Sequence, residues 1–584
     1  MSQAPDQTEA AQTPVSSGVA VVRAGIELGK HGFEQFAADR WLGLVLGPHG
    51  ESARVEVTLP PAFPDRLPTV RLLNANGQAA RAHIDREGKV CVAPATGVLL
   101  DADRPEQIVA QVLDRARNIL FSSDRDAELA ALHSEFVAYW PEEWASPYSI
   151  CALPRDAGEL VLVKLRGTSS LWIAGKSRAA VEAWASHVGW NALKGQRPAF
   201  LIVLDSLFEP PGFQQATTLR EFEELLRSRT SGSSWAAFSG WLEANGLPAD
   251  VLVAAPSPQR GEFMLFGAQL CPAANAGHGF RPGRCPTRLQ IQAAGNVPIR
   301  RMTVKRLDAG FVVTRGGGRP ELLTKRVTLL GCGAVGSHVA VGLAAAGVGS
   351  LHLVDCEQLA GENVHRHVLG MAHVGLYKVD GLAESIGKRF PHVVVEPDRR
   401  DIVDVLSKQP RLMREADLVI VALGDETLER RLNSTLRLDV PRIHVWLEPL
   451  GLGGHVLVTG VRGVPGCYEC LYQHDPDHGL VNMAGLTAPG QGFQRSIGGC
   501  AGTFSPYGCV DAERAAVEAV RTSIAVLFDE IAAPSLYSWV VSIMGIRAEG
   551  GRLSRRGETM QPGASRTDSD FARGDCSACG KNPP

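Results

Sequence analysis

Residues 326–336 read RVTLLGCGAVG, and this stretch decides how the C-terminal half of the chain folds. A run of apolar, strand-favouring residues leads into the glycine pattern Gly331-x-Gly333-x-x-Gly336, and a helical pattern of small residues follows. Glycines let the backbone approach phosphate, whose charge the amides and dipole of the helix N-terminus then favour. The stretch therefore predicts a nucleotide site, although the glycine pattern alone does not separate ATP from NAD or FAD.

Strands and helices alternate after this stretch. Apolar runs at 350–355, 392–397 and 416–423 are separated by helical patterns. Such alternation predicts a parallel, doubly wound Rossmann-like sheet over residues 319–584, with ligands bound at the carboxyl ends of the strands. The tail after Gly550 is polar and poor in apolar residues, so we expect it to be mobile up to the last two cysteines.

Polar and charged residues follow the ends of these strands. Asp355 closes the second strand, where a carboxylate binds ribose hydroxyls. Asn363, Arg366 and Lys378 come after it, and Asp425 follows a later strand. Two cations and an acid at this edge suit a triphosphate with magnesium. A hydride-transferring dehydrogenase, or cations that are merely solvated, are the alternatives.

Two CxxC pairs lie more than a hundred residues apart, at Cys467 and Cys470 and at Cys576 and Cys579. Four thiolates form a complete tetrahedral zinc set. Their separation predicts a clamp that ties the end of the chain to the nucleotide domain. In the alternative, one pair is redox-active, but a redox dithiol does not call for a second CxxC.

Three of the other cysteines in the same half of the chain bear on its chemistry. Cys500 follows a long stretch at about 474–499 that is rich in Gly, Pro and Gln and predicts a mobile crossover loop beside the nucleotide edge. Cys509 stands near a helix N-terminus, whose dipole stabilises a thiolate. Both are candidate nucleophiles, and a purely structural role for both is the alternative. Cys332, inside the glycine loop, is explained as a small filler.

The glycine pattern and the polar residues that follow the strands together resemble the ubiquitin-activating superfamily. This superfamily includes the ThiF- and MoeB-type adenylyltransferases that prime sulfur-carrier proteins. The resemblance covers roughly residues 320–548 and implies adenylation of a protein carboxylate, a thioester on Cys500, a zinc site and a homodimer. It assigns Asp355 to the ribose, Asn363, Arg366 and Lys378 to the phosphates, and Asp425 to magnesium.

Residues 18–148 form an α+β unit that resembles the ubiquitin-conjugating fold. The resemblance rests on PPAFPDRLP at 60–68, on AHIDREGKVCV at 82–92 and on a later helix. It places the thioester cysteine at Cys91. Conjugating enzymes usually carry asparagine where this chain has His83, an imidazole that can donate a hydrogen bond to an oxyanion. An inactive module that only binds a ubiquitin-like partner is the alternative.

The rest of the chain carries no recognisable chemistry. Residues 1–17 predict a disordered tail, and residues 149–318 predict an α/β linking domain with buried strands at 159–165, 199–205 and 250–256. The composition of the whole chain, 45% apolar and 21% charged with a formal net charge of -3, supports neither a nucleic-acid nor a membrane partner. The start of the chain lacks the regions of a signal peptide, and no apolar run approaches about 18 residues, so we expect a cytoplasmic protein.

Both halves on one chain resemble the bacterial activating-conjugating fusions found in CBASS antiphage systems. This implies that ATP, Mg²⁺ and Zn²⁺ are used to activate a protein with a glycine-like C-terminal tail, in that family a cGAS-like nucleotidyltransferase. Transfer to Cys91 and conjugation to target amines would follow, with Cys91, Cys500, His83, Arg366 and Lys378 as the catalytic residues. A sulfur-carrier-type adenylyltransferase with a non-catalytic binding module, or a nucleotide-sensing scaffold, are the competing functions.

Overall fold

The computed structural model falls into two compact units, the first made of Met1–Val181 and Ala192–Arg306, the second of Glu182–Asn191 and Leu307–Pro584. The structure describes residues 15–73, 80–93, 97–141, 148–150, 158–166, 170–212, 215–258, 262–274, 279–281, 284–408, 415–435, 440–496 and 503–580. Among these residues, no helix has the length and apolar character needed to cross a bilayer.

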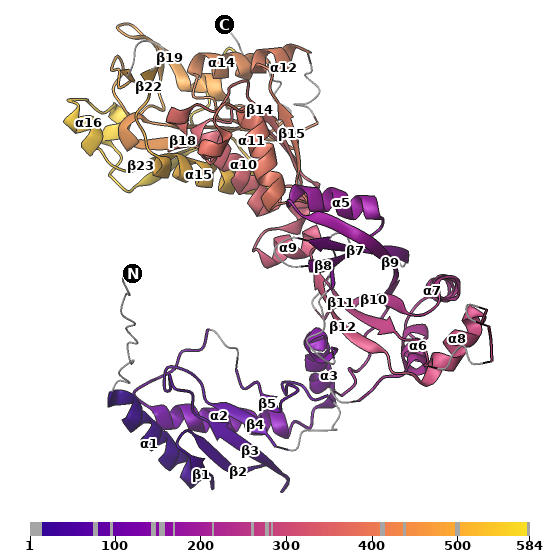
Figure 1. Cartoon of the computed structure of the whole chain (residues 1–584). Helices are drawn as coiled ribbons and strands as arrows, with labels where there is room; N and C mark the ends of the chain where they lie inside the picture. Colours follow the sequence, from indigo (N-terminus) through magenta and orange to yellow (C-terminus); the bar gives the residue numbers. More distant parts are fainter. Residues whose placement is uncertain are drawn as a thin grey trace, which may run out of the picture. The chain divides into compact units, whose positions relative to one another are not determined.

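The first unit contains an antiparallel meander, whose strands follow one another in chain order (Figure 1). The strands are β1 (Glu34–Ala37), β2 (Arg40–Leu46), β3 (Ser52–Thr58), β4 (Thr69–Leu72) and β5 (Lys89–Val90). Alternate side chains of β3, Val55 and Val57, are fully buried, as the period-two pattern of the sequence predicts. The resulting core packs against two helices.

Helix α1 (Val15–Lys30) precedes this sheet and begins inside the segment that the sequence analysis assigns to the tail. Its buried side chains Ala20, Ala24 and Leu28 recur every four residues, the spacing of one helix face. Helix α2 (Pro105–Leu120), which was predicted, begins with proline, a residue whose fixed φ suits a helix start.

Two short helices follow and carry part of the site around Cys91 that is described below. Helix α3 (Arg125–Ser134) is capped by Asp124, whose carboxylate accepts a hydrogen bond from Ala127 N at 2.9 Å. Glu135 lies between α3 and α4 (Phe136–Tyr139).

The rest of the first unit is a closed barrel of strand order β10-β11-β12-β6-β8-β7-β9. Its strands are β6 (Tyr148–Ile150), β7 (Gly158–Arg166), β8 (Ser170–Gly175), β9 (Asn191–Val203), β10 (Ala249–Pro256), β11 (Phe263–Leu270) and β12 (Arg300–Arg306). Its helices include α6 (Leu219–Arg227) and α7 (Gly232–Asn245). Successive residues of β9 belong to two cores, since Leu201 packs with the other barrel strands and Ile202 with α6 and α7. The three predicted strands are confirmed. The sequence did not predict that they belong to a closed barrel.

The second unit contains an eight-stranded sheet of order β15-β14-β13-β16-β17-β18-β23-β24, of which the first five strands are parallel. The strands are β13 (Arg326–Leu330), β14 (Ser350–Val354), β15 (Val394–Asp398), β16 (Leu418–Val421), β17 (Arg442–Leu447), β18 (Gly453–Thr459), β23 (Ser535–Val540) and β24 (Ser565–Asp568). The strand order reverses around β13, which makes its carboxyl end the place where a doubly wound sheet binds ligands.

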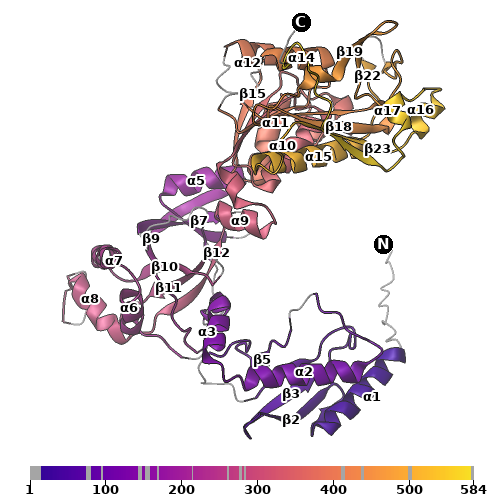
Figure 2. The same ribbon diagram turned by 180° about the vertical axis from the view of Figure 1, so that it is seen from behind.

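Helices cover both faces of this sheet (Figures 1 and 2). On one face, α10 (Ala334–Ala346), α11 (Lys378–Arg389) and α15 (Cys509–Leu527) bury their apolar sides. On the other, α12 (Ile402–Lys408) and α14 (Glu426–Thr435) pack over β13 and β16. The predicted three-layer Rossmann-like arrangement is therefore confirmed.

The tail after Gly550 is folded, and the prediction of a mobile tail is wrong. It forms α17 (Arg555–Glu558) and then β24, which pairs with β23 at the edge of the sheet. The Arg556 guanidinium donates to the Asp568 carboxylate, and both side chains are largely buried. A polar tail with few apolar residues is held here by ladder hydrogen bonds and a paired charge, which composition does not reveal.

Candidate functional site

The glycine loop connects β13 to α10. Gly331 has φ of +90°, and a Cβ on it would approach the carbonyl oxygen of Ala422 to 2.6 Å. A Cβ on Gly336 would lie 2.0 Å from the carbonyl oxygen of Gly331. These two glycines are therefore required by the backbone path, whereas Gly333 lies at the N-cap of α10 with open space beside it.

Two side chains fix the shape of this loop. Asp355 accepts hydrogen bonds from Cys332 N at 2.7 Å and Glu357 N at 2.8 Å, while burial raises the pKa of its carboxyl. His367 Nδ1 accepts from Leu369 N, so its Nε2–H donates to the Cys332 carbonyl at 2.9 Å. Burial lowers the pKa of His367 to about 4, which keeps it neutral. Cys332 is fully buried and burial raises its pKa, as a small filler requires.

The two predicted phosphate-binding cations lie on the same side of the sheet. Lys378 is the first residue of α11, is buried, and pairs with the Glu357 carboxylate. Within the described part of the chain, Arg366 makes no ion pair within 4.0 Å, and its guanidinium lies 5.3 Å from the ring centroid of Tyr507. The amide oxygen of Asn363 accepts from Ala360 N at 3.3 Å.

Asp425 follows β16, and the segment leading to it passes the glycine loop at Ala422. It precedes α14 and caps it, since its Oδ1 accepts from Leu428 N at 3.0 Å. The residue is exposed, so its second carboxylate oxygen remains available to a magnesium ion. The predicted acid thus lies at the carboxyl edge of the sheet.

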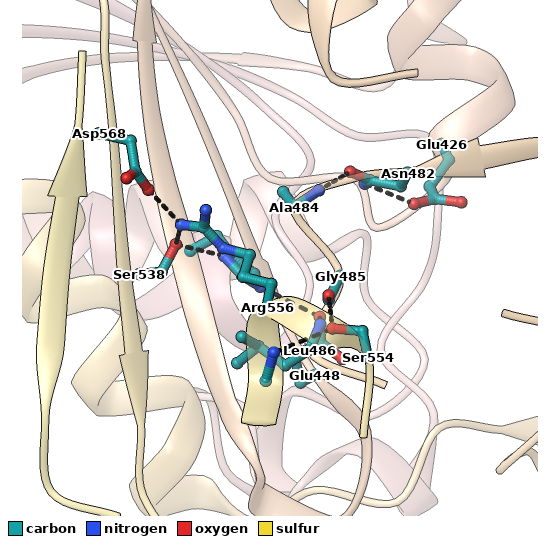
Figure 3. Close-up of polar contacts among 12 residues, drawn as sticks. Glu426, Glu448, Asn482, Ala484, Gly485, Leu486, Ser538, Ser554, Arg556 and Asp568 are labelled. Carbon is teal, nitrogen blue, oxygen red and sulfur yellow. Dashed lines mark hydrogen bonds and ion pairs between the residues drawn. The ribbon is translucent and has the colours of Figure 1, made fainter. Parts of the chain in front are cut away.

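Part of the predicted crossover loop is ordered, which corrects that expectation. Residues 472–482 form a hairpin of β19 (Tyr472–Asp475) and β20 (Gly479–Asn482). Figure 3 shows how the chain after it is anchored: Leu486 N donates to Glu448 Oε1 at 3.0 Å, and Ser554 Oγ donates to the Gly485 carbonyl at 2.7 Å. The stretch that the sequence predicted to be a mobile loop is therefore ordered in its first half and held by hydrogen bonds at Gly485 and Leu486.

Glu448 also connects this segment to side chains within the sheet. Glu448 Oε1 also lies 3.1 Å from Nε2 of the buried His455, whose Nδ1 lies 2.9 Å from Ser538 Oγ. Arg556 Nη2 donates to that hydroxyl at 2.9 Å (Figure 3). On the other side, Asn482 donates to Glu426 at 2.9 Å, directly beside Asp425. The anchored chain therefore links the folded tail to the edge that carries the acid.

The two candidate nucleophilic cysteines are placed differently. Cys500 lies outside the described residues. Cys509 is the first residue of α15, as predicted, with its Sγ 3.4 Å from Glu513 Oε1 and 3.9 Å from His338 Nε2. Burial and the Glu513 carboxylate raise the pKa of the Cys509 thiol, which opposes the stabilising helix dipole expected from the sequence. This environment disfavours Cys509 as a thiolate nucleophile.

The four predicted zinc ligands meet in one cluster. The sulfurs of Cys467 and Cys470 are 4.0 Å apart, those of Cys467 and Cys576 are 3.7 Å apart, and those of Cys470 and Cys579 are 3.4 Å apart. A tetrahedral Zn²⁺ with Zn–S bonds of about 2.3 Å requires sulfur separations of about 3.8 Å. The thiol set is therefore compatible with zinc.

The cluster is attached to α14. Asn433 Nδ2 donates to Cys467 Sγ at 3.4 Å, and Arg430 forms two hydrogen bonds to the Glu469 carboxylate at 2.7 and 2.8 Å. Because α14 begins directly after Asp425, the cluster supports the element that positions the acid. Loss of the metal would therefore disturb more than the end of the chain.

We expect about one zinc ion per purified chain, because the geometry matches a closed structural site. Cys576→Ser should lose this zinc and lower the melting temperature, since structural zinc contributes to folding. Elemental analysis and thermal unfolding measure both effects. Cys356→Ser, which changes an exposed cysteine outside the cluster, is the control and should keep its zinc. Zinc retained by Cys576→Ser would contradict the assignment.

The N-terminal site surrounds Cys91, which follows β5 and is exposed. Its backbone N donates to the His83 carbonyl at 2.7 Å, so the two predicted residues are in direct contact. His83 has φ of +61°, an uncommon conformation for a residue with a side chain. Its Nδ1 lies 3.0 Å from Glu135 Oε1. The sequence analysis did not identify Glu135.

Cys91 opens into a cavity of about 1650 Å³. The segment PPAFPDRLP, which suggested the conjugating fold, supplies part of its lining, and His83, Glu135 and Tyr139 supply another part. Its charged lining residues are Asp65, Arg66, Asp85, Arg86, Glu87, Lys89 and Glu135. An exposed thiol beside a cavity of this size is accessible to a polypeptide tail and to an attacking amine.

Two family models match separate parts of the chain. Residues 309–527 match the ThiF family, and residues 40–147 match the family described as Prokaryotic E2 family B. The chain therefore combines an E2-like domain with a ThiF-type, E1-like domain.

Individual relatives are similar over part of their length. The uncharacterized protein y4oA of Sinorhizobium fredii is 29% identical over 272 residues, which are 42% of this chain and 43% of that protein. The ATP-dependent ubiquitin transferase-like protein Cap2 of Pseudomonas aeruginosa is 28% identical over 211 residues, 35% of this chain and 37% of Cap2. A structure of E. coli MccB with ATP aligns at 20% identity and a TM-score of 0.33, covering 46% of this chain and 72% of MccB. The chain thus spans about two fifths of the length of these curated relatives.

Proposed function

We propose that this fusion of an E2-like with an E1-like domain activates the C-terminus of a protein with ATP and conjugates it to target amines. The E1-like domain adenylates the carboxylate, Cys500 takes it as a thioester, and Cys91 receives it by thiol exchange. Attack by an amine then forms the amide and releases the Cys91 thiolate.

The E1-like domain supports the first step. Its glycine loop, a partly buried Asp355 at the end of the next strand, and the cations Arg366 and Lys378 supply what a nucleoside triphosphate needs. We assign Asn363 to the phosphates as well. Asp425 would hold Mg²⁺, which neutralises charge on the triphosphate as the carboxylate attacks. Cys467, Cys470, Cys576 and Cys579 would hold Zn²⁺ in a structural role.

Cys500 is proposed over Cys509 as the activating cysteine. Burial and the neighbouring Glu513 carboxylate raise the pKa of the Cys509 thiol, so a smaller fraction of it is ionised at neutral pH. Cys500 has the position that the ubiquitin-activating families use.

The observation that carries the conjugation step is the exposed Cys91 beside its cavity, with His83 bonded to its backbone. A sulfur-carrier-type adenylyltransferase with a non-catalytic binding module would not need an accessible thiol in a domain matched to the E2 family. The match to Cap2 also favours conjugation, since its printed name is that of a ubiquitin transferase-like protein.

By the same likeness, we propose a role in CBASS antiphage defence. The activated protein would be a cGAS-like nucleotidyltransferase with a glycine-like C-terminal tail, joined to acceptor proteins in the cytoplasm. We also propose that the chain acts as a homodimer.

The test uses the full chain with ATP, Mg²⁺ and a cGAS-like nucleotidyltransferase as the candidate cargo. We expect pyrophosphate release and cargo adducts on Cys500 and Cys91 that dithiothreitol removes. Mass spectrometry of proteolytic peptides locates both adducts. ATP–pyrophosphate exchange without any adduct on Cys91 would support the sulfur-carrier function. The absence of ATP–pyrophosphate exchange would support a nucleotide-sensing scaffold.

A further inference from the structure

A carboxylate is bonded to the histidine that stands beside the conjugating cysteine. Glu135 Oε1 lies 3.0 Å from His83 Nδ1, and Glu135 Oε2 accepts the Tyr139 hydroxyl at 2.7 Å. Both side chains of the His83–Glu135 pair are partly exposed, at 40% and 34%, and both line the cavity that Cys91 opens into. The pair is therefore accessible to whatever occupies that cavity.

The bond determines which nitrogen carries the hydrogen. An ionised carboxylate only accepts hydrogen bonds, so His83 Nδ1 must donate to Glu135. In the neutral imidazole, Nε2 is then left with a lone pair. Within the described part of the chain, Nε2 makes no hydrogen bond, so this lone pair is available to accept a proton.

The backbone also holds His83 beside Cys91. Its carbonyl accepts from Cys91 N at 2.7 Å, and its φ of +61° is kept although a side chain usually avoids it. Observed strain of this kind is concentrated at functional sites. Glu135 comes from the junction of α3 and α4, which is remote in sequence, so two separate segments converge on one histidine.

From this geometry we propose that His83 is the general base for amide formation at Cys91 and that Glu135 is its positioning residue. The inference rests on the conjugating function proposed above. The amine nitrogen attacks the thioester carbonyl and transfers a proton to His83 Nε2. The nitrogen–carbon bond forms, the carbon–sulfur bond breaks, and its electron pair leaves on the Cys91 thiolate. The Glu135 carboxylate stabilises the imidazolium, which then returns the proton to the thiolate or to water.

This role differs from donation to an oxyanion. A neutral His83 with its hydrogen on Nδ1 has no hydrogen on Nε2 to donate, so only the imidazolium could stabilise an oxyanion. The contribution of His83 to the discharge rate therefore increases with pH if it acts as a base, and decreases with pH if it donates to an oxyanion. Asparagine, usual at this position, can donate but cannot act as a base near neutral pH.

The experiment charges Cys91 chemically, which makes it independent of the ATP-dependent half. A glycine-ending peptide, supplied as its mercaptoethanesulfonate thioester, is exchanged onto the full chain. L-lysine is then added, and mass spectrometry follows the loss of the adduct from the Cys91 peptide. Rates are compared as wild-type-to-variant ratios between pH 6 and 9, so that the ionisation of lysine cancels.

Glu135→Gln should slow discharge about tenfold or more, which is a part of the roughly 10²–10⁴-fold that a general base contributes, while charging is unchanged. The wild-type-to-variant ratio for His83→Asn should increase with pH and then level off, because only the neutral imidazole can accept a proton from the amine. Asp126→Asn removes an exposed charge from the first turn of α3, outside the lining of the cavity, and it should match the wild type.

Equal discharge by Glu135→Gln and the wild type would overturn the inference and leave the proposed function intact. A His83→Asn ratio that falls with pH would also overturn it, because it would indicate oxyanion donation. A wild-type adduct that lysine does not discharge would remove the conjugation step of the proposed function and the inference with it.

Discussion

Replacing Asp425 with alanine is expected to reduce ATP–pyrophosphate exchange about a hundredfold or more. The physical reason is that Asp425 is the acid assigned to Mg²⁺, whose charge stabilises the triphosphate during attack by the carboxylate. The exchange of labelled pyrophosphate into ATP, measured with the full chain and the candidate cargo, reports this step directly.

Asp425 also has a structural role, which the sequence does not show. Asp425 also caps α14 through Leu428 N, and loss of an N-cap costs about 1 kcal/mol of stability. Because α14 is attached to the four-thiol cluster, a loosened helix could impair exchange without any loss of metal binding.

Asp425→Asn separates the two effects. Its amide oxygen caps a helix about as well as aspartate, yet it lacks the charge that magnesium prefers. We expect Asp425→Asn to melt like the wild type and still to lose exchange. If Asp425→Asn retains exchange while Asp425→Ala loses it, the residue acts through the helix, and the magnesium assignment is wrong.

The sequence predicted the nucleotide domain well because its signals are local. The central strand β16 is a continuous apolar run that is buried along its whole length, β13 and β14 are buried along most of theirs, and the glycine pattern marks the turn between β13 and α10. The thiol cluster was also predictable, since CxxC spacing is specific. Asp355, Lys378 and Asp425 could be placed because strand ends in such a sheet meet at one edge.

What the sequence analysis missed depends on contacts between distant segments. Glu135 binds His83 across 52 residues, and nothing in either local pattern indicates this bond. The folded tail gains its order from pairing with β23, from the Arg556–Asp568 pair and from a few apolar contacts such as that of the buried Met560. Helix α1, by contrast, could have been found from Ala20, Ala24 and Leu28, whose four-residue period was obscured by the polar start of the chain.

Replacing Cys91 with alanine is expected to abolish conjugation completely while leaving adenylation and the Cys500 thioester intact. The sulfur of Cys91 forms the final thioester, so no other residue can replace it in the transfer from Cys500 to the amine. The side chain is exposed and contributes little packing, so the variant should melt within a degree or two of the wild type. Non-reducing gels and peptide mass spectrometry measure conjugates and adducts in one reaction.

Cys91→Ser sharpens this test, because a serine that receives the cargo forms an oxyester that dithiothreitol does not cleave. Accumulation of such an adduct would place Cys91 on the path between Cys500 and the amine. Cys356→Ala, which removes another exposed thiol, is the matched control and should conjugate normally. Conjugates formed by Cys91→Ala at the wild-type rate would show that the amine attacks the Cys500 thioester directly. The E2-like domain would then only bind the cargo, and its cavity would serve recognition instead of catalysis.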